Sequence, residues 1–86
     1  MTESLHHPAY RNITEAVKAM RHAAGLSQRD LAAKLGRELS FVSRLEQGQR
    51  RLDLLEWVWV CEALGRDPIE EGKAVLAKLR SKNTRR

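Results

Sequence analysis

Two short helical patterns joined by a glycine occupy residues 27–48 and constrain the fold more than any other part of the sequence. The first pattern repeats every three or four residues and stops at Gly36. The second ends at Gly48, a residue suited to a left-handed helix terminus. Helices of about eight residues are not stable alone, so the rest of the chain must hold them and present them. The periodic positions are Gln28, Leu31, Ala32 and Leu35, followed by Val42 and Leu45.

The length of the chain limits it to one small core. Its 86 residues predict a single domain over 10–80, with a flexible arm at 1–9 and a basic, disordered tail at 81–86. The apolar periodicity and the Gly and Pro breaks predict an all-α fold, a compact five-helix bundle. Its helices are expected at about 10–24, 28–35, 39–47, 54–64 and 68–80.

The charge of the chain favours a polyanionic partner. There are 16 Lys and Arg against 11 Asp and Glu, which gives a formal net charge of +5. Six of the basic residues and no acids lie between Lys73 and Arg86. This end of the chain is either a solvated tail or an extra, sequence-independent attraction to phosphate. A basic surface that serves only solubility remains the alternative for the whole domain.

Other classes of function find little support in the sequence. No catalytic grouping of Cys, His and carboxylates and no glycine-rich phosphate loop is recognisable, so we expect no enzyme and no cofactor. His6 and His7 lack further ligands at metal-binding spacing, so no metal is expected. Cys61 is expected in the core. Without an apolar run of about 18 residues or a signal-peptide pattern, the chain is expected in the cytoplasm and away from membranes.

The two-helix segment resembles the helix-turn-helix of the phage Cro and repressor family, also known as the XRE type. The strings GLSQ at 25–28 and LEQG at 45–48 carry the resemblance, together with Ala32, Gly36 and Val42. It covers about residues 13–68 and continues in RRLDLLEW and ALGRDP, which are similar to a bacterial subgroup. The resemblance implies a lambda-repressor-like DNA-binding domain that regulates transcription.

By match to the family's recognition helix, residues 39–47 are expected to enter the major groove of DNA. Arg44 can donate two parallel hydrogen bonds to guanine, although a solvated arginine or a phosphate contact is the alternative. Many relatives carry glutamine where Leu39 stands, and leucine offers only apolar contact to a thymine methyl. Phe41 is expected to pack. The expected base contacts are Glu38, Leu39, Ser40, Ser43 and Arg44.

Contacts to the DNA backbone are expected at the helix ends. The family grips phosphate at the amino end of its first motif helix, where the helix dipole attracts anions. Arg51 can instead pair with Asp53 or Glu56 to fix its loop. The expected phosphate contacts are Ser27, Gln28, Gln47, Gln49, Arg50 and Arg51. The resemblance also implies a structural ion pair between Arg21 and Glu46.

The segment 54–64 is more apolar than one buried helix face requires. We expect Leu54, Trp57, Cys61 and Leu64 to face the core, which leaves Trp59 as surplus apolar area. Trp59 either packs under the last helix or belongs to a self-complementary patch. Because the family usually dimerises through this part, a homodimer is expected. Its interface residues are expected to be Leu55, Trp59, Ile69, Leu76 and Leu79.

These features predict a sequence-specific transcription regulator, a repressor that binds double-stranded DNA at a two-part operator in a bacterial or phage setting. The alternative is a protein-interaction module on the same scaffold, such as an antitoxin. The surplus apolar surface around Trp59 favours that alternative. A toxin would then be the protein partner, whereas RNA polymerase would be the partner of a regulator that activates transcription.

Overall fold

The computed structural model describes residues 8–82 and confirms the all-α fold. No strand occurs among these residues. The five α-helices begin and end within two residues of the expected positions. The elements are the 3-10 helix η1 Pro8–Tyr10 and the α-helices α2 Arg11–Ala23, α3 Gln28–Leu35, α4 Leu39–Glu46, α5 Leu54–Ala63 and α6 Pro68–Lys82.

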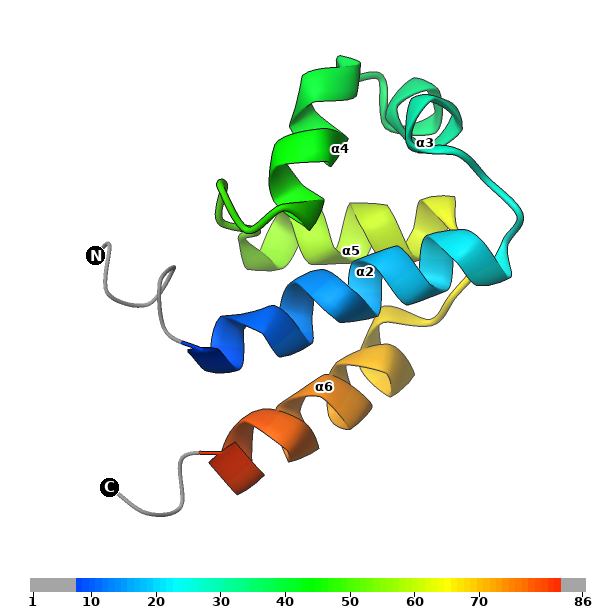
Figure 1. Ribbon diagram of the computed structural model, residues 1–86. Helices are drawn as coiled ribbons and strands as arrows, with labels where there is room; N and C mark the ends of the chain where they lie inside the picture. The colour runs from blue at the N-terminus through cyan, green and yellow to red at the C-terminus, as the bar shows by residue number, and fades with distance from the viewer. Residues whose placement is uncertain (1–7, 83–86) are drawn as a thin grey trace.

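The helices α2 and α5 form the middle of the molecule (Figure 1). Helices α3 and α4 lie on one side of this pair, and α6 lies on the other side. In agreement with this arrangement, α3 and α4 contact each other and the central helices, while α6 contacts α2 and α5. The motif pair α3–α4 is therefore presented on the side of the bundle opposite α6.

The core lies between α2, α3, α4 and α5. Each fully buried aliphatic side chain contributes roughly 1.5–3 kcal/mol to folding relative to an exposed one. Among residues 68–80 of helix α6, the side chains that face the bundle, such as Val75 and Leu79, are half-buried. This part of α6 therefore covers the core from outside. The fully buried side chains are Val17, Leu31, Val42, Leu45, Val60 and Cys61.

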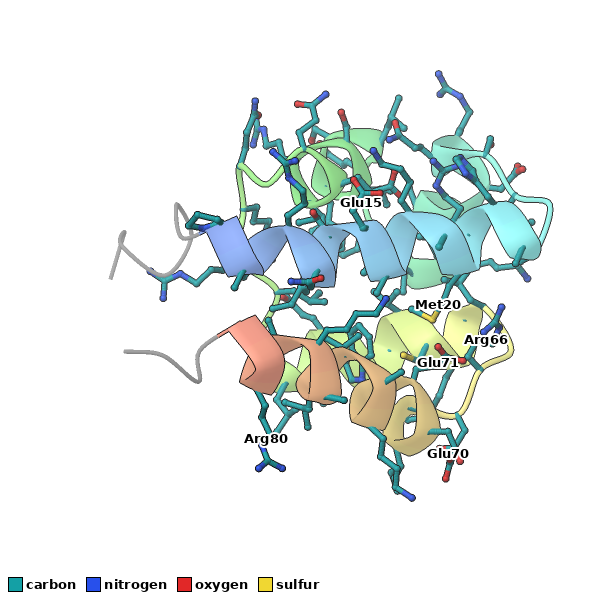
Figure 2. The ribbon with its side chains drawn as sticks, turned by 60° about the horizontal axis from the view of Figure 1, so that its bottom comes forward. Glu15, Met20, Arg66, Glu70, Glu71 and Arg80 are labelled. Atoms are coloured by element: carbon teal, nitrogen blue, oxygen red, sulfur yellow. The ribbon has the colours of Figure 1, made fainter. Side chains whose placement is uncertain are left out.

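Two contacts connect the loops beside α5 to other elements. The hydroxyl of Tyr10 accepts a hydrogen bond of 2.7 Å from the backbone N–H of Leu52, which joins the start of α2 to the loop before α5. Figure 2 shows Arg66 and Glu71 facing each other at the turn into α6, where their ion pair measures 2.6 Å. The first contact precedes α5 and is partly buried, whereas the second follows α5 and is a partly exposed surface pair.

The boundaries of the predicted arm and tail need correction. Pro8–Tyr10 form a 3-10 helix in which Ala9 is buried, so the domain begins two residues earlier than expected. Helix α6 reaches Lys82, inside the predicted tail. The rest of the arm, with His6 and His7, and residues 83–86 of the tail lie outside the described residues.

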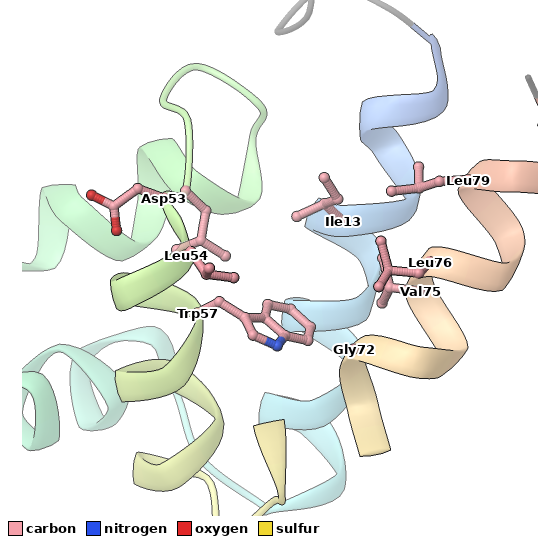
Figure 3. A pocket seen from close by; sticks show the side chains of 9 residues that line it. Ile13, Asp53, Leu54, Trp57, Gly72, Val75, Leu76 and Leu79 are labelled. Carbon is pink, nitrogen blue, oxygen red and sulfur yellow. The ribbon is translucent and has the colours of Figure 1, made fainter. Parts of the chain in front are cut away.

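The expectation that Leu54 faces the core is wrong. Its side chain is 80% exposed, whereas Glu56 is 7% exposed and takes the inward position one turn before Val60. The side chain of Leu54 borders an open apolar groove of about 210 Å³ between α5, α2 and α6 (Figure 3). Trp57 lies on the floor of this groove, and its indole N–H donates to the carbonyl of Pro68 at 3.0 Å.

Candidate nucleic-acid interface

The two ends of α3 are fixed by a capping box and by backbone geometry. Ser27 Oγ accepts from the N–H of Asp30, and the Asp30 carboxylate accepts from the N–H of Ser27, both at 3.0 Å. This capping box fixes the start of α3. At the other end, Gly36 adopts φ of 66°, a left-handed conformation that glycine reaches without steric cost. The N–H of Arg37 then donates to the carbonyl of Ala32 at 2.9 Å, which completes the helix end.

One side of α4 is anchored in the core and the other side is open. Phe41, Val42 and Leu45 are buried, so the expectation that Phe41 packs is confirmed. On the open side, Leu39 is 37% exposed. The predicted base contacts therefore lie together on one surface: Glu38, Leu39, Ser40 and Arg44 are exposed, and Ser43 is half-buried.

The predicted pair between Arg21 and Glu46 is present and ties α2 to the end of α4. Arg21 donates through Nε at 2.7 Å and through Nη2 at 3.0 Å to the two carboxylate oxygens. Burial raises the pKa of Glu46, but hydrogen bonds from Arg21 and Gln28 lower it by more, so the pKa lies below its usual 4.5. Glu46 is therefore ionised at neutral pH, and α4 is held by a paired charge as well as by apolar packing.

Gln28 has a structural partner that the sequence did not indicate. Its side-chain amide donates to Glu46 Oε1 at 2.9 Å, across the motif from α3 to α4. Ser27 likewise uses its hydroxyl in the capping box of α3. Both residues still lie at the amino end of α3, where a phosphate contact was expected. Their roles toward DNA stay a prediction.

The loop after α4 places Arg50 against a second buried carboxylate, that of Glu56 at the start of α5. Glu56 accepts hydrogen bonds of 2.8 Å from both Nη atoms of Arg50. These bonds lower the pKa of Glu56, so it too is charged at neutral pH. Among the other predicted phosphate contacts, Gln47, Gln49 and Arg51 are exposed. The structure thus brings Arg50 to the protein's own acid as well as to the expected DNA side.

Arg37 also belongs to this surface, although it is not among the DNA contacts predicted from the sequence. Its guanidinium carbon lies 4.0 Å from the centre of the Phe41 ring, and its Nη1 lies 3.9 Å from Glu56 Oε2. An arginine four residues before an aromatic residue is the only local signal for this contact. Together these groups border an open polar groove lined by Gly36, Arg37, Glu38, Ser40, Phe41, Arg44 and Arg50.

Apolar side chains are exposed on α5 and α6. Trp59 is 48% exposed and Leu55 is 56% exposed, so Trp59 is not covered by α6 within one chain. Ile69 and Leu76 of α6 are 68% and 60% exposed, and Leu79 is half-buried. We call Leu55, Trp59, Ile69, Leu76 and Leu79 the apolar patch.

Other chemistry is sparse in the described part of the chain. Among residues 8–82, no three His, Cys, Asp or Glu side chains gather as a metal site. Burial raises the pKa of the Cys61 thiol to about 11, so it is protonated at neutral pH and a poor nucleophile. Within the same residues, no helix has both the length and the apolar character needed to cross a membrane.

Comparisons with known proteins agree with this geometry. The profile of a family described as a helix-turn-helix domain matches residues 13–79. Among solved structures, the chain is similar to an XRE-family like protein from Pseudomonas syringae pv. tomato str. DC3000, with 39% identity, a TM-score of 0.73 and coverage of 95% of each chain. Two structures of the clp gene regulator ClgR from Corynebacterium glutamicum share the fold, at 20% and 22% identity with TM-scores of 0.73 and 0.69. The alignments cover 88% and 91% of this chain and 81% and 96% of those chains. No curated protein sequence matches the chain.

Proposed function

The chain belongs to the XRE and Cro family of helix-turn-helix transcription regulators, and we propose that this DNA-binding protein is a repressor that binds a two-part operator as a homodimer. Repression follows from occupation of promoter DNA. The proposed site of action is the bacterial or phage nucleoid in the cytoplasm.

The observation that carries this proposal is the open side of α4. It presents Leu39, Ser40 and Arg44 to solvent, while Val42 and Leu45 fix the helix from behind. A helix of this length fits the major groove, where each base pair displays its own pattern of donors and acceptors. A rigid helix with a polar outer side suits the reading of such a pattern.

The residues around α4 have distinct proposed roles. Arg44 donates a bidentate pair of hydrogen bonds to guanine, and Leu39 contacts a thymine methyl. Phosphates are bound on both flanks of α4 and fix its register in the groove without reading sequence. The proposed base contacts are Glu38, Leu39, Ser40, Ser43 and Arg44, and the proposed phosphate contacts are Ser27, Gln28, Gln47, Gln49, Arg50 and Arg51.

The apolar patch supports the two-part operator. A twofold axis that pairs two such patches buries them and sets two α4 helices into successive major grooves. One turn of DNA separates such half-sites by about 34–36 Å. An operator of two related half-sites is then expected.

A second candidate function rests on the same patch. Trp59 and Leu55 offer exposed apolar area to a different protein as readily as to a second copy. In that case the chain is a protein-interaction module, such as an antitoxin that binds a toxin. A chain that is monomeric and shifts no duplex would favour this function.

Selection of bound sequences from a random duplex pool tests the proposal. We expect enrichment of one motif in two symmetric halves, with centres about 10–10.5 base pairs apart. A pool that enriches nothing would contradict sequence-specific binding.

The selected site then allows a test of Arg44. Arg44→Ala is expected to weaken binding to it by about fivefold to a hundredfold, the loss of one bidentate pair, while binding to random DNA changes little. Arg66→Ala removes the same charge near α6 and is the matched control. Equal loss on both DNAs would make Arg44 a phosphate contact instead.

A further inference from the structure

One buried carboxylate of α5 contacts two arginines that line the polar groove beside α4. Glu56 lies outside the α3–α4 motif, and its side chain is 9% exposed. Arg50, from the loop after α4, donates two hydrogen bonds of 2.8 Å to it. Arg37, from the turn before α4, places Nη1 3.9 Å from the same carboxylate. Glu56 therefore links the residues that flank both ends of α4.

The ring of Phe41 constrains the same two arginines. The guanidinium carbons of Arg37 and Arg50 lie 4.0 Å and 4.5 Å from the centre of the ring. At these distances the ring attracts each cation. Because Phe41 is buried in the core cluster, the ring is a fixed support. Each arginine is thus held by two independent contacts, one with the ring and one with Glu56.

Glu56 is itself fixed and does not need to move to make these contacts. Its Oε1 accepts a hydrogen bond of 3.1 Å from the N–H of Asp53, and its own N–H donates to Asp53 Oδ1 at 2.8 Å. This capping box locks the carboxylate at the start of α5. Its position is therefore set by folding.

Both arginines keep N–H groups for a ligand. Within residues 8–82, Arg50 uses three of its five N–H donors, two on Glu56 and one on the carbonyl of Arg51. Within the described residues, the guanidinium of Arg37 donates no hydrogen bond, and its side chain is 39% exposed. Both line the polar groove beside α4, together with Arg44. Planar guanidinium groups with spare donors match the oxygens of a phosphodiester.

We propose that Glu56 and Phe41 are positioning residues, which hold Arg37 and Arg50 in the orientation that binds DNA phosphates on the two flanks of α4. This inference rests on the proposed function, because DNA is the ligand. The two long side chains are ordered during folding, so their entropy cost does not reduce the affinity for DNA. Arg37 becomes a phosphate contact that the sequence did not suggest.

Removal of the Glu56 charge distinguishes two explanations of its role: that it positions the arginines, or that it acts only as a negative charge near DNA. Glu56→Gln raises the formal net charge by one, from +5 to +6. If Glu56 acts only as a negative charge near DNA, the variant binds more tightly. If Glu56 positions the arginines, the variant binds more weakly, because both side chains must then be ordered on binding. The two explanations predict opposite signs.

The experiment measures dissociation constants on the selected duplex for the wild-type chain, Glu56→Gln and the control Glu70→Gln. Glu70 is exposed and belongs to α6. Helix α6 lies on the side of the molecule opposite α4 (Figure 1), and Glu70→Gln changes the net charge by the same amount. We expect Glu56→Gln to bind roughly fivefold or more weakly, since two side chains lose their order. Glu70→Gln is expected to bind as the wild type does. Binding of Glu56→Gln at or above the control affinity would overturn the proposal.

Two exposed variants test the same idea should Glu56→Gln fold poorly. Arg37→Ala is expected to reduce the slope of log affinity against log salt by about one, the loss of one phosphate contact, while Arg66→Ala leaves the slope unchanged. Arg37→Lys keeps the charge but cannot stack as a planar group, so it is expected to bind severalfold more weakly than wild type. An unchanged slope for the first variant, or wild-type affinity for the second, would overturn the proposal. A wild-type chain that binds no duplex would instead refute the proposed function.

Discussion

Two buried acids, each paired with an arginine, define the site at the scale of residues. Glu46 joins α4 to Arg21 of α2, and Glu56 joins α5 to Arg50 of the loop between α4 and α5. A buried charge is costly when unpaired, so each pair depends on both members. Both acids are buried, and neither lies on the exposed side of α4. They determine where the outward side of α4 lies.

The Glu46 pair makes stability depend on pH. Because hydrogen bonds from Arg21 and Gln28 outweigh burial, the folded pKa of Glu46 lies below the 4.5 of an unfolded chain. Its contribution is therefore fully present above about pH 4.5 and is lost as the pH falls through the folded pKa. We expect Glu46→Gln to cost about 3–5 kcal/mol at pH 7 and to lose this part of the acid dependence.

Urea denaturation between pH 3 and 7, monitored by circular dichroism, measures the unfolding free energy of each variant. Glu15→Gln is the control, because Glu15 forms only an exposed pair with Lys18 at 3.8 Å. The difference in unfolding free energy between wild type and Glu46→Gln should shrink on acidification. A difference in unfolding free energy that stays constant across this range would show that Glu46 does not stabilise the fold through its charge.

At the scale of elements, the helix ends were predictable because local residues determine them. Ser27 with Asp30 starts α3, and Gly36 ends it. The periodicity of α4 likewise indicated which side faces outward, since Val42 and Leu45 on its inner side are buried as expected. Those features depend on neighbours within one or two helical turns. They were readable before any tertiary contact was known.

The start of α5 was predicted less well, because a buried ion pair replaces an apolar contact there. A reading that assigns only apolar residues to the core places Leu54 inside and Glu56 outside, the reverse of the structure. The cause is the partner: Arg50 neutralises Glu56 and makes its burial favourable. The contact between Arg37 and Glu56 spans 19 positions in the sequence, and periodicity carries no information over such distances.

Replacement of glycine by alanine is expected to have opposite effects on stability at Gly36 and at Gly72. Gly36 has φ of 66°, and nothing lies within 4 Å of an added Cβ, so Gly36→Ala pays only for the left-handed backbone, about 1–2 kcal/mol. Gly72 lies inside α6, where an added Cβ meets Trp57 Nε1 at 3.5 Å, an ordinary contact. Gly72→Ala should therefore stabilise the protein by about 0.5–1 kcal/mol.

Denaturation midpoints at equal slope measure both changes, and each variant serves as the control for the other. Loss of stability in Gly72→Ala would show that α6 cannot accept the extra methyl group against Trp57. Stability of Gly36→Ala equal to wild type would show that the turn relaxes to another conformation. In that case the left-handed conformation of Gly36 would not be required for the turn between α3 and α4.

At the scale of the whole molecule, the bundle separates two surfaces. The extents of the molecule are 40 × 26 × 20 Å, and α3 and α4 lie on the side opposite α6 (Figure 1). The polar groove beside α4 is on the first side, whereas part of the apolar patch belongs to α6. A second copy that covers the patch leaves α4 free for DNA. The proposed dimerisation and the proposed DNA binding would thus use different surfaces of one small domain.

The two tryptophans of α5 test this separation. Trp59 is 48% exposed and belongs to the apolar patch, so we expect Trp59→Ala to halve the apparent mass in sedimentation equilibrium while helical content by circular dichroism is unchanged. Its affinity for the two-part operator should fall further than its affinity for one half-site, because a monomer loses the linked second contact. Trp57→Ala is the matched control: Trp57 packs against the core and donates to Pro68, so its loss should cost roughly 3–5 kcal/mol and reduce helicity. Retention of the wild-type mass by Trp59→Ala would place the dimer contact elsewhere, and loss of helicity in Trp59→Ala would make Trp59 part of the core.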